Sequence, residues 1–182
     1  AKVLEKTEAD EAADMLSELP DALAQELLAL LPDKRQQDLR RLASHPEHTA
    51  GSLMTTDFVM LPQRATAGKA LAWIRRERPE QHMMTYLYIV DSEERLVGVV
   101  SLRDLVLAGP DDEMRTIMED DLVEVGVDAD EEEVGRIMTK YDLLAIPVVD
   151  EGRHLLGIVT LDDALEAVVP EDWKQRLPRI YR

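Results

Sequence analysis

The chain contains one pattern twice, and this repeat limits its fold more than any other feature. Residues 89–106 read IVDSEERLVGVVSLRDLV, and residues 148–165 read VVDEGRHLLGIVTLDDAL. Both runs pass from β-rich residues through a polar turn into a second β-rich run and then into a helix. A single copy leaves one face of its sheet uncovered, so we expect the two copies to pack against each other.

The repeat extends toward the N-terminus from these runs, but its spacing changes. Gly98 and Gly157 are 59 positions apart, whereas Met54 and Met118 are 64 positions apart. The first copy therefore carries five extra residues (64 − 59). We place them near residues 76–84, in a loop between elements.

The order of elements is the same in both copies. An apolar stretch that predicts a strand precedes an amphipathic stretch that predicts a helix, and the two β-rich runs and a last helix come after them. These strand and helix stretches are residues 58–61 and 67–76 in the first copy and residues 122–127 and 130–140 in the second. Thr66 and Asp128 are candidate N-caps of the amphipathic helices, and Ser101 and Thr160 are candidate N-caps of the last helices. Each copy is thus predicted to be β-α-β-β-α, and the fold class to be α+β.

The residues before the repeat are predicted to form short helices. The pattern MLSELP at residues 15–20 recurs as LLALLP at residues 27–32. Each proline is expected to end one helix or open the next, with Asp21 and Asp33 as candidate caps. Helices this short bury little apolar surface alone, so either more helices precede residue 1 or these helices rest on the later part of the chain. Residues 44–52 (SHPEHTAGS) are the candidate linker.

Composition excludes several classes of protein. The chain carries 38 acids and 21 bases, a formal net charge of −17. Such a chain repels nucleic-acid phosphates and anionic lipids, so we expect no nucleic-acid partner. It has no cysteine, which excludes disulfides and thiolate metal sites. The longest apolar runs fall short of the roughly 20 residues that span a bilayer, and no signal peptide is recognisable.

The repeat resembles the CBS domain, whose G-h-h-[ST]-x-x-D signature occurs as GVVSLRD at residues 98–104 and as GIVTLDD at residues 157–163. A tandem pair of such domains is a Bateman module. The segment AGSLMT at residues 50–55, after helices with L-P steps, is similar to the cytosolic part of MgtE-type magnesium transporters. In that family a helical N domain precedes a CBS pair. The resemblance implies a partial helical N domain at residues 1–49, CBS repeats at residues 50–109 and 110–169, and a basic tail at residues 170–182.

One departure from the family concerns the C-terminal end. In MgtE-type proteins the last CBS helix leads into a connecting helix and then into the membrane pore. Here Pro170 interrupts that point, and WKQRLPRIYR at residues 173–182 has four bases and no acid. The chain is therefore either a soluble relative or the partner of a different membrane segment. We expect the tail to pack on the CBS pair, with direct contact to anionic lipid as the alternative.

The second copy is strongly acidic. Sixteen acids lie between residues 120 and 172, opposed only by Arg136, Lys140 and Arg153. Magnesium prefers carboxylate and other oxygen ligands, and a divalent ion would relieve the repulsion between two acidic surfaces. The resemblance to MgtE-type proteins implies ion ligands at Asp130, Glu132, Asp142, Asp163 and Glu166. A solvated acidic surface that holds no ion is the alternative.

The resemblance also implies a cleft for ATP or another adenosine nucleotide between the two copies. Asp104 and Asp163 would bind the ribose hydroxyls, and Ser101 and Thr160 would contact phosphate near a helix N-terminus. In the alternative, each hydroxyl only caps its helix and each aspartate only holds a turn. Asp163 belongs to both the ion and the nucleotide prediction, so the two ligands would be coupled there.

No catalytic constellation can be defined. His45 and His48 lie in the polar linker without a third ligand, and the acids are too numerous to single out a pair. We therefore predict that the chain is not an enzyme. It is expected to be a cytosolic regulatory module at the inner face of the membrane, which senses magnesium for a transporter as ions draw the helical and CBS domains together. The alternative is an adenosine-nucleotide-binding CBS module without ion sensing. We expect a homodimer through the CBS pair.

Overall fold

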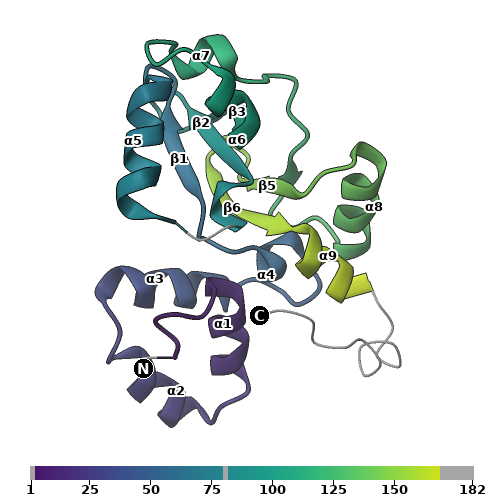
Figure 1. Ribbon diagram of the computed structural model, residues 1–182. Coiled ribbons are helices and arrows are strands. Elements are labelled where there is room, and N and C mark those ends of the chain that lie inside the picture. Colours follow the sequence, from purple (N-terminus) through teal and green to yellow (C-terminus); the bar gives the residue numbers. More distant parts are fainter. Residues whose placement is uncertain (1–2, 80–81, 169–182) are drawn as a thin grey trace, which may run out of the picture.

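A helical lobe lies beside a larger lobe that contains both sheets, as the computed structural model shows (Figure 1). The structure describes residues 3–79 and 82–168. The basic tail predicted at residues 170–182 lies outside the described residues, and so does the packing expected of it. Among the helices in the described part of the chain, none is long and apolar enough to cross a membrane.

Three short helices form the helical lobe. They are α1 (Ala9–Ser17), α2 (Asp21–Leu28) and α3 (Asp33–Leu42). The prolines open helices as predicted, but the prediction that Asp21 and Asp33 are caps is wrong. The N-cap positions belong to Pro20 and Pro32, whose extended backbone directly precedes each helix. The two aspartates therefore lie in the first turn, where the helix dipole favours a negative charge.

The larger lobe contains α4 (Ala50–Leu53) and the two repeats. The first repeat consists of β1 (Val59–Pro62), α5 (Ala67–Glu77), the short 3-10 helix η1 (His82–Met84), β2 (Tyr86–Val90), β3 (Leu96–Ser101) and α6 (Leu102–Leu107). The second consists of α7 (Met114–Ile117), β4 (Val125–Gly126), α8 (Glu131–Tyr141), β5 (Ala145–Val149), β6 (Leu155–Thr160) and α9 (Leu161–Val168). The sheets have the orders β1-β2-β3 and β4-β5-β6, each with a parallel and then an antiparallel pair. The predicted β-α-β-β-α order and the α+β class are confirmed.

The leading segment of each repeat crosses to the sheet of the other repeat. Thr55, from the start of the first repeat, pairs with Ile158 of β6. Glu119, from the start of the second repeat, pairs with Val99 of β3. The two bridges are related by the same spacings of 64 and 59 that the sequence shows. An internal two-fold symmetry therefore relates the repeats, down to single residue pairs.

The glycine of each signature allows this crossing. A Cβ atom added to Gly157 would lie 2.7 Å from Cγ of Met54, and one added to Gly98 would lie 2.8 Å from Cγ of Met118. Both distances are shorter than carbon atoms tolerate, so a side chain at either position would push the crossing segment away. The signature glycine is thus a packing requirement between repeats.

The predicted helix starts are partly confirmed. Ser101 is the N-cap of α6, because its Oγ accepts a hydrogen bond from the Asp104 N–H at 3.1 Å. Thr66 occupies the N-cap position of α5, but its side chain makes no capping bond to the described residues.

The predicted cap of the amphipathic helix in the second repeat is wrong. The cap is Asp130 rather than Asp128, and its Oδ1 accepts a hydrogen bond from the Glu132 N–H at 2.9 Å. A turn closed by the bond from the Ala129 N–H to the Gly126 carbonyl, at 3.0 Å, occupies the earlier position. The helix therefore starts after this turn.

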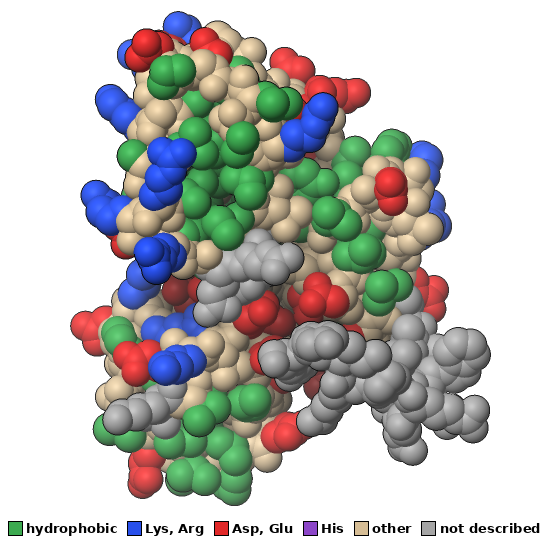
Figure 2. Space-filling model, viewed as in Figure 1, with side chains coloured by type: hydrophobic (Ala, Val, Ile, Leu, Met, Phe, Trp, Pro, Cys, Tyr) green, Lys and Arg blue, Asp and Glu red, His purple; other side chains and the backbone are tan. Residues whose placement is uncertain are grey.

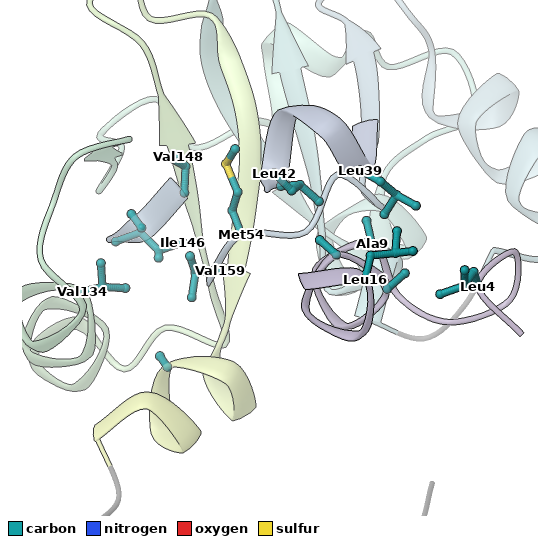
Figure 3. Packing of buried hydrophobic residues seen from close by; sticks show 14 of the residues in the cluster. Leu4, Ala9, Leu16, Leu39, Leu42, Met54, Val134, Ile146, Val148 and Val159 are labelled. Carbon is teal, nitrogen blue, oxygen red and sulfur yellow. The ribbon is translucent and has the colours of Figure 1, made fainter. Parts of the chain in front are cut away.

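The helical lobe shares one buried apolar cluster with the second repeat (Figure 3). Its members include Leu4, Ala9, Leu16, Leu39 and Leu42 of the helical lobe, and Met54, Val134, Ile146, Val148 and Val159 of the larger lobe. The first repeat has a core of its own, around Leu87, Ile89 and Leu105. Although the helical lobe precedes the first repeat in the sequence, it packs on the second, because the segment with Met54 crosses over.

Candidate functional site

A cleft of about 230 Å³ lies between the two repeats, and we call it the first cleft. It is lined by Tyr86, Tyr88, Val99, Ser101 and Asp104 of the first repeat and by Glu119, Asp121, Leu122, Val123, Leu143, Ala145 and Pro147 of the second. Pockets that enclose a drug-sized ligand usually measure about 300–1,000 Å³. At about 230 Å³, the first cleft is slightly smaller than this range, so it would enclose a small ligand or one part of a larger ligand.

Polar groups suited to a nucleoside line the first cleft. Ser101 Oγ donates to Asp104 Oδ2 at 2.6 Å, and the Asp104 side chain is 49% exposed. Arg103 Nη1 lies 3.5 Å from Asp104 Oδ1, so a cation stands beside the carboxylate. Tyr88 is almost fully buried, and its hydroxyl has no hydrogen-bond partner among the described residues. Burial raises the pKa of Tyr88, so this hydroxyl remains a donor that a ligand could satisfy.

The matching residues of the second repeat lie elsewhere. Thr160 Oγ1 donates to Asp162 Oδ1 at 2.6 Å and also to Asp163 Oδ2. Asp163 faces Asp10 on α1 of the helical lobe, whose charge acts on it directly. Of the predicted nucleotide residues, Ser101 and Asp104 therefore line the first cleft, whereas Thr160 and Asp163 lie where the two lobes meet.

Acidic side chains gather along this junction, as Figure 2 shows. We call them the acidic seam, formed by Asp10, Glu11 and Asp14 of α1 and by Asp162, Asp163 and Glu166 of α9. The charge of Asp10 acts on Asp163, and the charge of Glu166 acts on Asp14. The carboxylates of α1 in the helical lobe therefore face the carboxylates of α9 in the larger lobe.

The buried members of the seam hold their protons unusually tightly. Asp10 is only 8% exposed, and its Oδ1 has no hydrogen-bond partner in the described part of the chain. Burial, with a smaller contribution from Glu8, raises the pKa of Asp10 to about 6. Burial and then the charge of Asp10 raise the pKa of Asp163 to about 7. Near neutral pH, the seam is therefore under repulsion that a proton or a cation would relieve.

The seam fits a hydrated magnesium ion better than a dry metal cage. Within residues 3–79 and 82–168, no group of three His, Asp or Glu side chains is assembled for a metal. Magnesium, however, keeps several of its waters and is usually held by one or two carboxylates. The half-buried Asp163 and the exposed Glu166 are carboxylates of that kind, and the buried Asp10 beside them adds negative charge.

The five predicted ion ligands do not converge on one point. Asp163 and Glu166 lie in the acidic seam, whereas Asp130 and Glu132 lie at the start of α8 and Asp142 comes directly after its last residue. The 11 residues of α8 span on the order of 16 Å at 1.5 Å per residue. One ion cannot bridge that length, so Asp142 cannot share an ion with Asp130 and Glu132.

Sequence reasoning missed the acids of the helical lobe. Asp10 lies on the buried face of α1, beside Ala9, Ala13 and Leu16. A carboxylate at an apolar position of an amphipathic helix was the available signal, because buried charges normally have a partner. The carboxylate that faces Asp10 is on α9, more than a hundred positions away, and no local pattern could reveal it.

Basic side chains of α3 also join the lobes. Arg35 Nη1 lies 3.3 Å from Asp57 Oδ2 in the leading segment of the first repeat. The same guanidinium donates to the carbonyls of Leu4 and Thr7 within the helical lobe. Arg41 Nη2 donates to the Leu156 carbonyl of β6 at 3.1 Å. The helical lobe is therefore held by basic side chains of α3 while its acidic helix α1 meets acids.

Comparison with known families identifies both lobes. Residues 1–48 match the MgtE intracellular N domain, and residues 50–111 and 114–170 match the CBS domain. Over 165 residues the chain is 39% identical to the magnesium transporter MgtE of Thermus thermophilus, which covers 89% of this chain and 37% of that protein. The corresponding protein of Bacillus subtilis is 33% identical over 168 residues, which is 92% of this chain and 37% of that protein. The chain thus spans 37% of the length of these relatives.

A solved structure has the same architecture. The crystal structure of the cytosolic domain of the Mg²⁺ channel MgtE in complex with ATP matches with a TM-score of 0.86 at 39% identity. The match covers 92% of this chain and 68% of that chain. The combination of a helical lobe with a CBS pair is therefore shared with that domain.

Proposed function

This chain belongs to the CBS-domain family and carries an MgtE intracellular N domain ahead of its CBS pair, and from this premise we propose that it is a cytosolic module that senses magnesium for a membrane transporter. The role is regulatory and not catalytic: ion occupancy sets how closely the helical lobe and the CBS lobe approach. The chain spans 37% of the length of its relatives. That it acts together with a membrane transporter is therefore also a proposal.

The acidic seam is the observation that carries this proposal. Asp10 and Asp163 come from different lobes, and each raises the electrostatic cost of the other's negative charge. Without a cation, this repulsion opposes docking of the helical lobe, although the shared apolar cluster and Arg35 favour it. The two sets of forces oppose each other, so a bound divalent ion can shift the balance.

The ion would act by mass action on the docked state. A ligand that binds only one state stabilises it by about 2.7 kcal/mol when its concentration is a hundred times its dissociation constant. In the proposal, Asp163 and Glu166 hold magnesium in the seam together with acids of α1. Asp130, Glu132 and Asp142 remain proposed ligands of separate, outer ions around α8.

A magnesium titration tests the proposal. The radius of gyration from small-angle scattering and the melting temperature are measured as magnesium rises through the millimolar range at fixed ionic strength. We expect compaction and a higher melting temperature, both weakened by Asp163→Asn. Glu26→Gln, on the exposed surface of α2, is the matched control and should respond like the unaltered chain. Scattering and melting curves that stay flat would contradict magnesium sensing.

Adenosine-nucleotide binding in the first cleft is a second candidate function. The unpartnered Tyr88 hydroxyl and the pair formed by Ser101 and Asp104 favour it, and the matching cytosolic domain of MgtE was solved with ATP. Calorimetric titration with AMP and with ATP should give heat that Asp104→Ala removes. The exposed Asp111 provides a control, since Asp111→Ala should leave the heat unchanged. An absence of heat with both nucleotides would exclude this function.

We further propose that the module pairs with a second copy through its CBS repeats. Val106 and Leu107, at the end of α6, are 62% and 70% exposed, which is costly for large apolar side chains next to each other. Sedimentation should show a dimer that Leu107→Glu converts to a monomer. Leu30→Glu is the matched control, because Leu30 is 69% exposed on the helical lobe. A monomeric unaltered chain would exclude the homodimer.

A further inference from the structure

The internal two-fold symmetry implies a second cleft that mirrors the first. The spacings of 64 and 59 place Thr55 and Asp57 where the first cleft has Glu119 and Asp121. They also place Thr160 and Asp163 where the first cleft has Ser101 and Asp104. The bridges between Thr55 and Ile158 and between Glu119 and Val99 confirm that these positions are structurally equivalent. We call the region of Thr55, Asp57, Thr160 and Asp163 the second cleft.

The helical lobe covers the second cleft. Asp10 of α1 lies beside the Thr55 side chain and faces Asp163. Arg35 of α3 pairs with Asp57 at 3.3 Å. Three of the four residues that define the second cleft therefore contact or face the helical lobe directly.

Burial differs between the two clefts in the way that such a cover predicts. Thr55 is 0% exposed and Thr160 is 6% exposed, whereas their counterparts are exposed (Glu119) and half-buried (Ser101). Equivalent positions with the same residue type differ in the same direction, since Asp57 and Asp163 are half-buried whereas Asp121 and Asp104 are exposed. The helical lobe accounts for this difference, because it lies over one cleft only.

We propose that the helical lobe is the built-in occupant of the second cleft, so that an adenosine ligand and the docked lobe compete for it. The inference rests on the adenosine binding proposed for the first cleft. When the lobe leaves, Asp163 becomes available to the ribose hydroxyls, and Thr160 to phosphate at the start of α9, as Asp104 and Ser101 are in the first cleft. Aromatic surface is present as well, because Phe58 stands where the first cleft has Leu122.

Competition gives the two ligands of the module opposite effects at this cleft. Magnesium in the acidic seam stabilises the docked lobe and so closes the second cleft. An adenosine ligand in the second cleft binds only the undocked state and so opposes magnesium by mass action. The first cleft does not touch Asp10 or Arg35 and is open in the docked state.

Calorimetric titration of the full chain with AMP tests the proposal. Millimolar magnesium is present throughout, and AMP is chosen because its single phosphate removes little of that magnesium. The unaltered chain should bind one AMP per chain. Arg35→Glu places a carboxylate against Asp57 and should raise the stoichiometry to two. Arg40→Glu is the matched control: it makes the same charge change on α3, but the side-chain bond of Arg40 within the described residues goes to Gln25 of the helical lobe, so one AMP should bind.

The position of the extra AMP is tested in the Arg35→Glu background. Adding Asp163→Ala should return the stoichiometry to one by removing the second cleft. Adding Asp104→Ala should also leave one bound AMP per chain, and this AMP should lie in the second cleft. An extra AMP that survives Asp163→Ala would overturn the proposal. So would an Arg35→Glu chain that scattering shows to be expanded and that still binds one AMP.

Two further results keep the test decisive. Arg35 also bonds within the helical lobe, so its substitution could unfold that lobe. The second cleft would then still be uncovered. AMP binding in the first cleft reports whether the CBS pair is intact. If scattering shows that the Arg35→Glu chain stays compact, Arg41→Glu, which removes the bond to Leu156, is added. A double variant that expands and still binds one AMP contradicts the proposed cover. If the unaltered chain binds no AMP but Arg35→Glu binds one that needs Asp163, the first-cleft function fails and the cover stands. If no variant binds AMP, both fail.

Discussion

The two clefts of the CBS lobe come from the same repeated sequence, yet they have different surroundings. In the first cleft Asp104 bonds to Ser101 and remains half exposed. In the second, Asp163 bonds to Thr160 and faces a buried carboxylate from another lobe. The repeated residues keep their local hydrogen bond in both places. What differs is the neighbour, so the signature alone does not predict what surrounds each copy.

The largest effect is expected where the crossing segments pack. Met54→Ala should lower the free energy of unfolding by about 2–5 kcal/mol, because a fully buried methionine is removed from the cluster that joins the lobes. Met118→Ala, at the symmetric position, should cost less, because Met118 is only partly buried. Chemical denaturation of both variants measures the difference. Equal losses would show that the helical lobe adds nothing to the packing at Met54.

The pH dependence of stability should come from Asp10 and Asp163 of the acidic seam. The folded-state pKa values of Asp10 and Asp163 are raised from 3.8 to about 6 and about 7. Between pH 4 and 7 the folded chain therefore holds protons that the unfolded chain releases, so stability falls as pH rises and the loss is complete above about pH 7. Each pKa unit corresponds to about 1.4 kcal/mol, so the two raised pKa values together correspond to about 7 kcal/mol. Thermal melts in chelator should show that stability falls as pH rises, and magnesium should make this pH dependence weaker. If the pH dependence is unchanged in Asp163→Asn, it comes from other titratable groups.

Neutralising one side of the acidic seam should stabilise the protein. Asp10→Asn keeps the shape of the side chain and removes the buried charge that faces Asp163. In chelator above pH 7 we expect a gain of about 1–3 kcal/mol in the free energy of unfolding, together with a weaker response of the melting temperature to magnesium. Glu26→Gln is the control on the exposed surface of the same lobe. A loss of stability in Asp10→Asn would mean that repulsion across the seam is not the dominant force there.

The smallest effect is expected in the first cleft. Ser101→Ala removes the N-cap of α6 and should cost about 1 kcal/mol. It should leave the response to magnesium unchanged, because the first cleft does not touch the helical lobe. The melting temperature with and without magnesium measures both effects. A changed magnesium response would show that the two clefts are coupled through the sheets.

Local features of the sequence were sufficient for much of this architecture. The alternation of β-rich runs and amphipathic stretches predicted the element order in both repeats, and the structure confirms it. Ser101 was recognised as a cap because capping depends on a residue three positions away. The errors were also local. Asp128 was predicted as the cap of α8, but a turn closed by Gly126 and Ala129 delays the start of the helix and makes Asp130 the cap. Such a turn has no strong signature in the sequence.

The site was less predictable than the fold. Asp163 was singled out from its signature, but its neighbour Asp10 was not, because the two carboxylates are brought together only when the helical lobe folds onto the second repeat. Arg35 and Asp57 were missed for the same reason. The pair of Asp10 and Asp163 forms part of the acidic seam, and the pair of Arg35 and Asp57 holds the helical lobe over the second cleft. In each pair the two residues come from different parts of the chain.

By itself, the sequence determined that two equivalent repeats would fold into β-α-β-β-α units and pack together, because hydrophobic periodicity and helix caps act over a few residues. Only the tertiary structure decided that the helical lobe docks on the second repeat rather than on the first, which it precedes. The physical reason is the crossing of the leading segment, which buries Met54 against Gly157 and carries the helical lobe over the second cleft. That choice places Asp10 against Asp163, so the two copies of the signature have different neighbours.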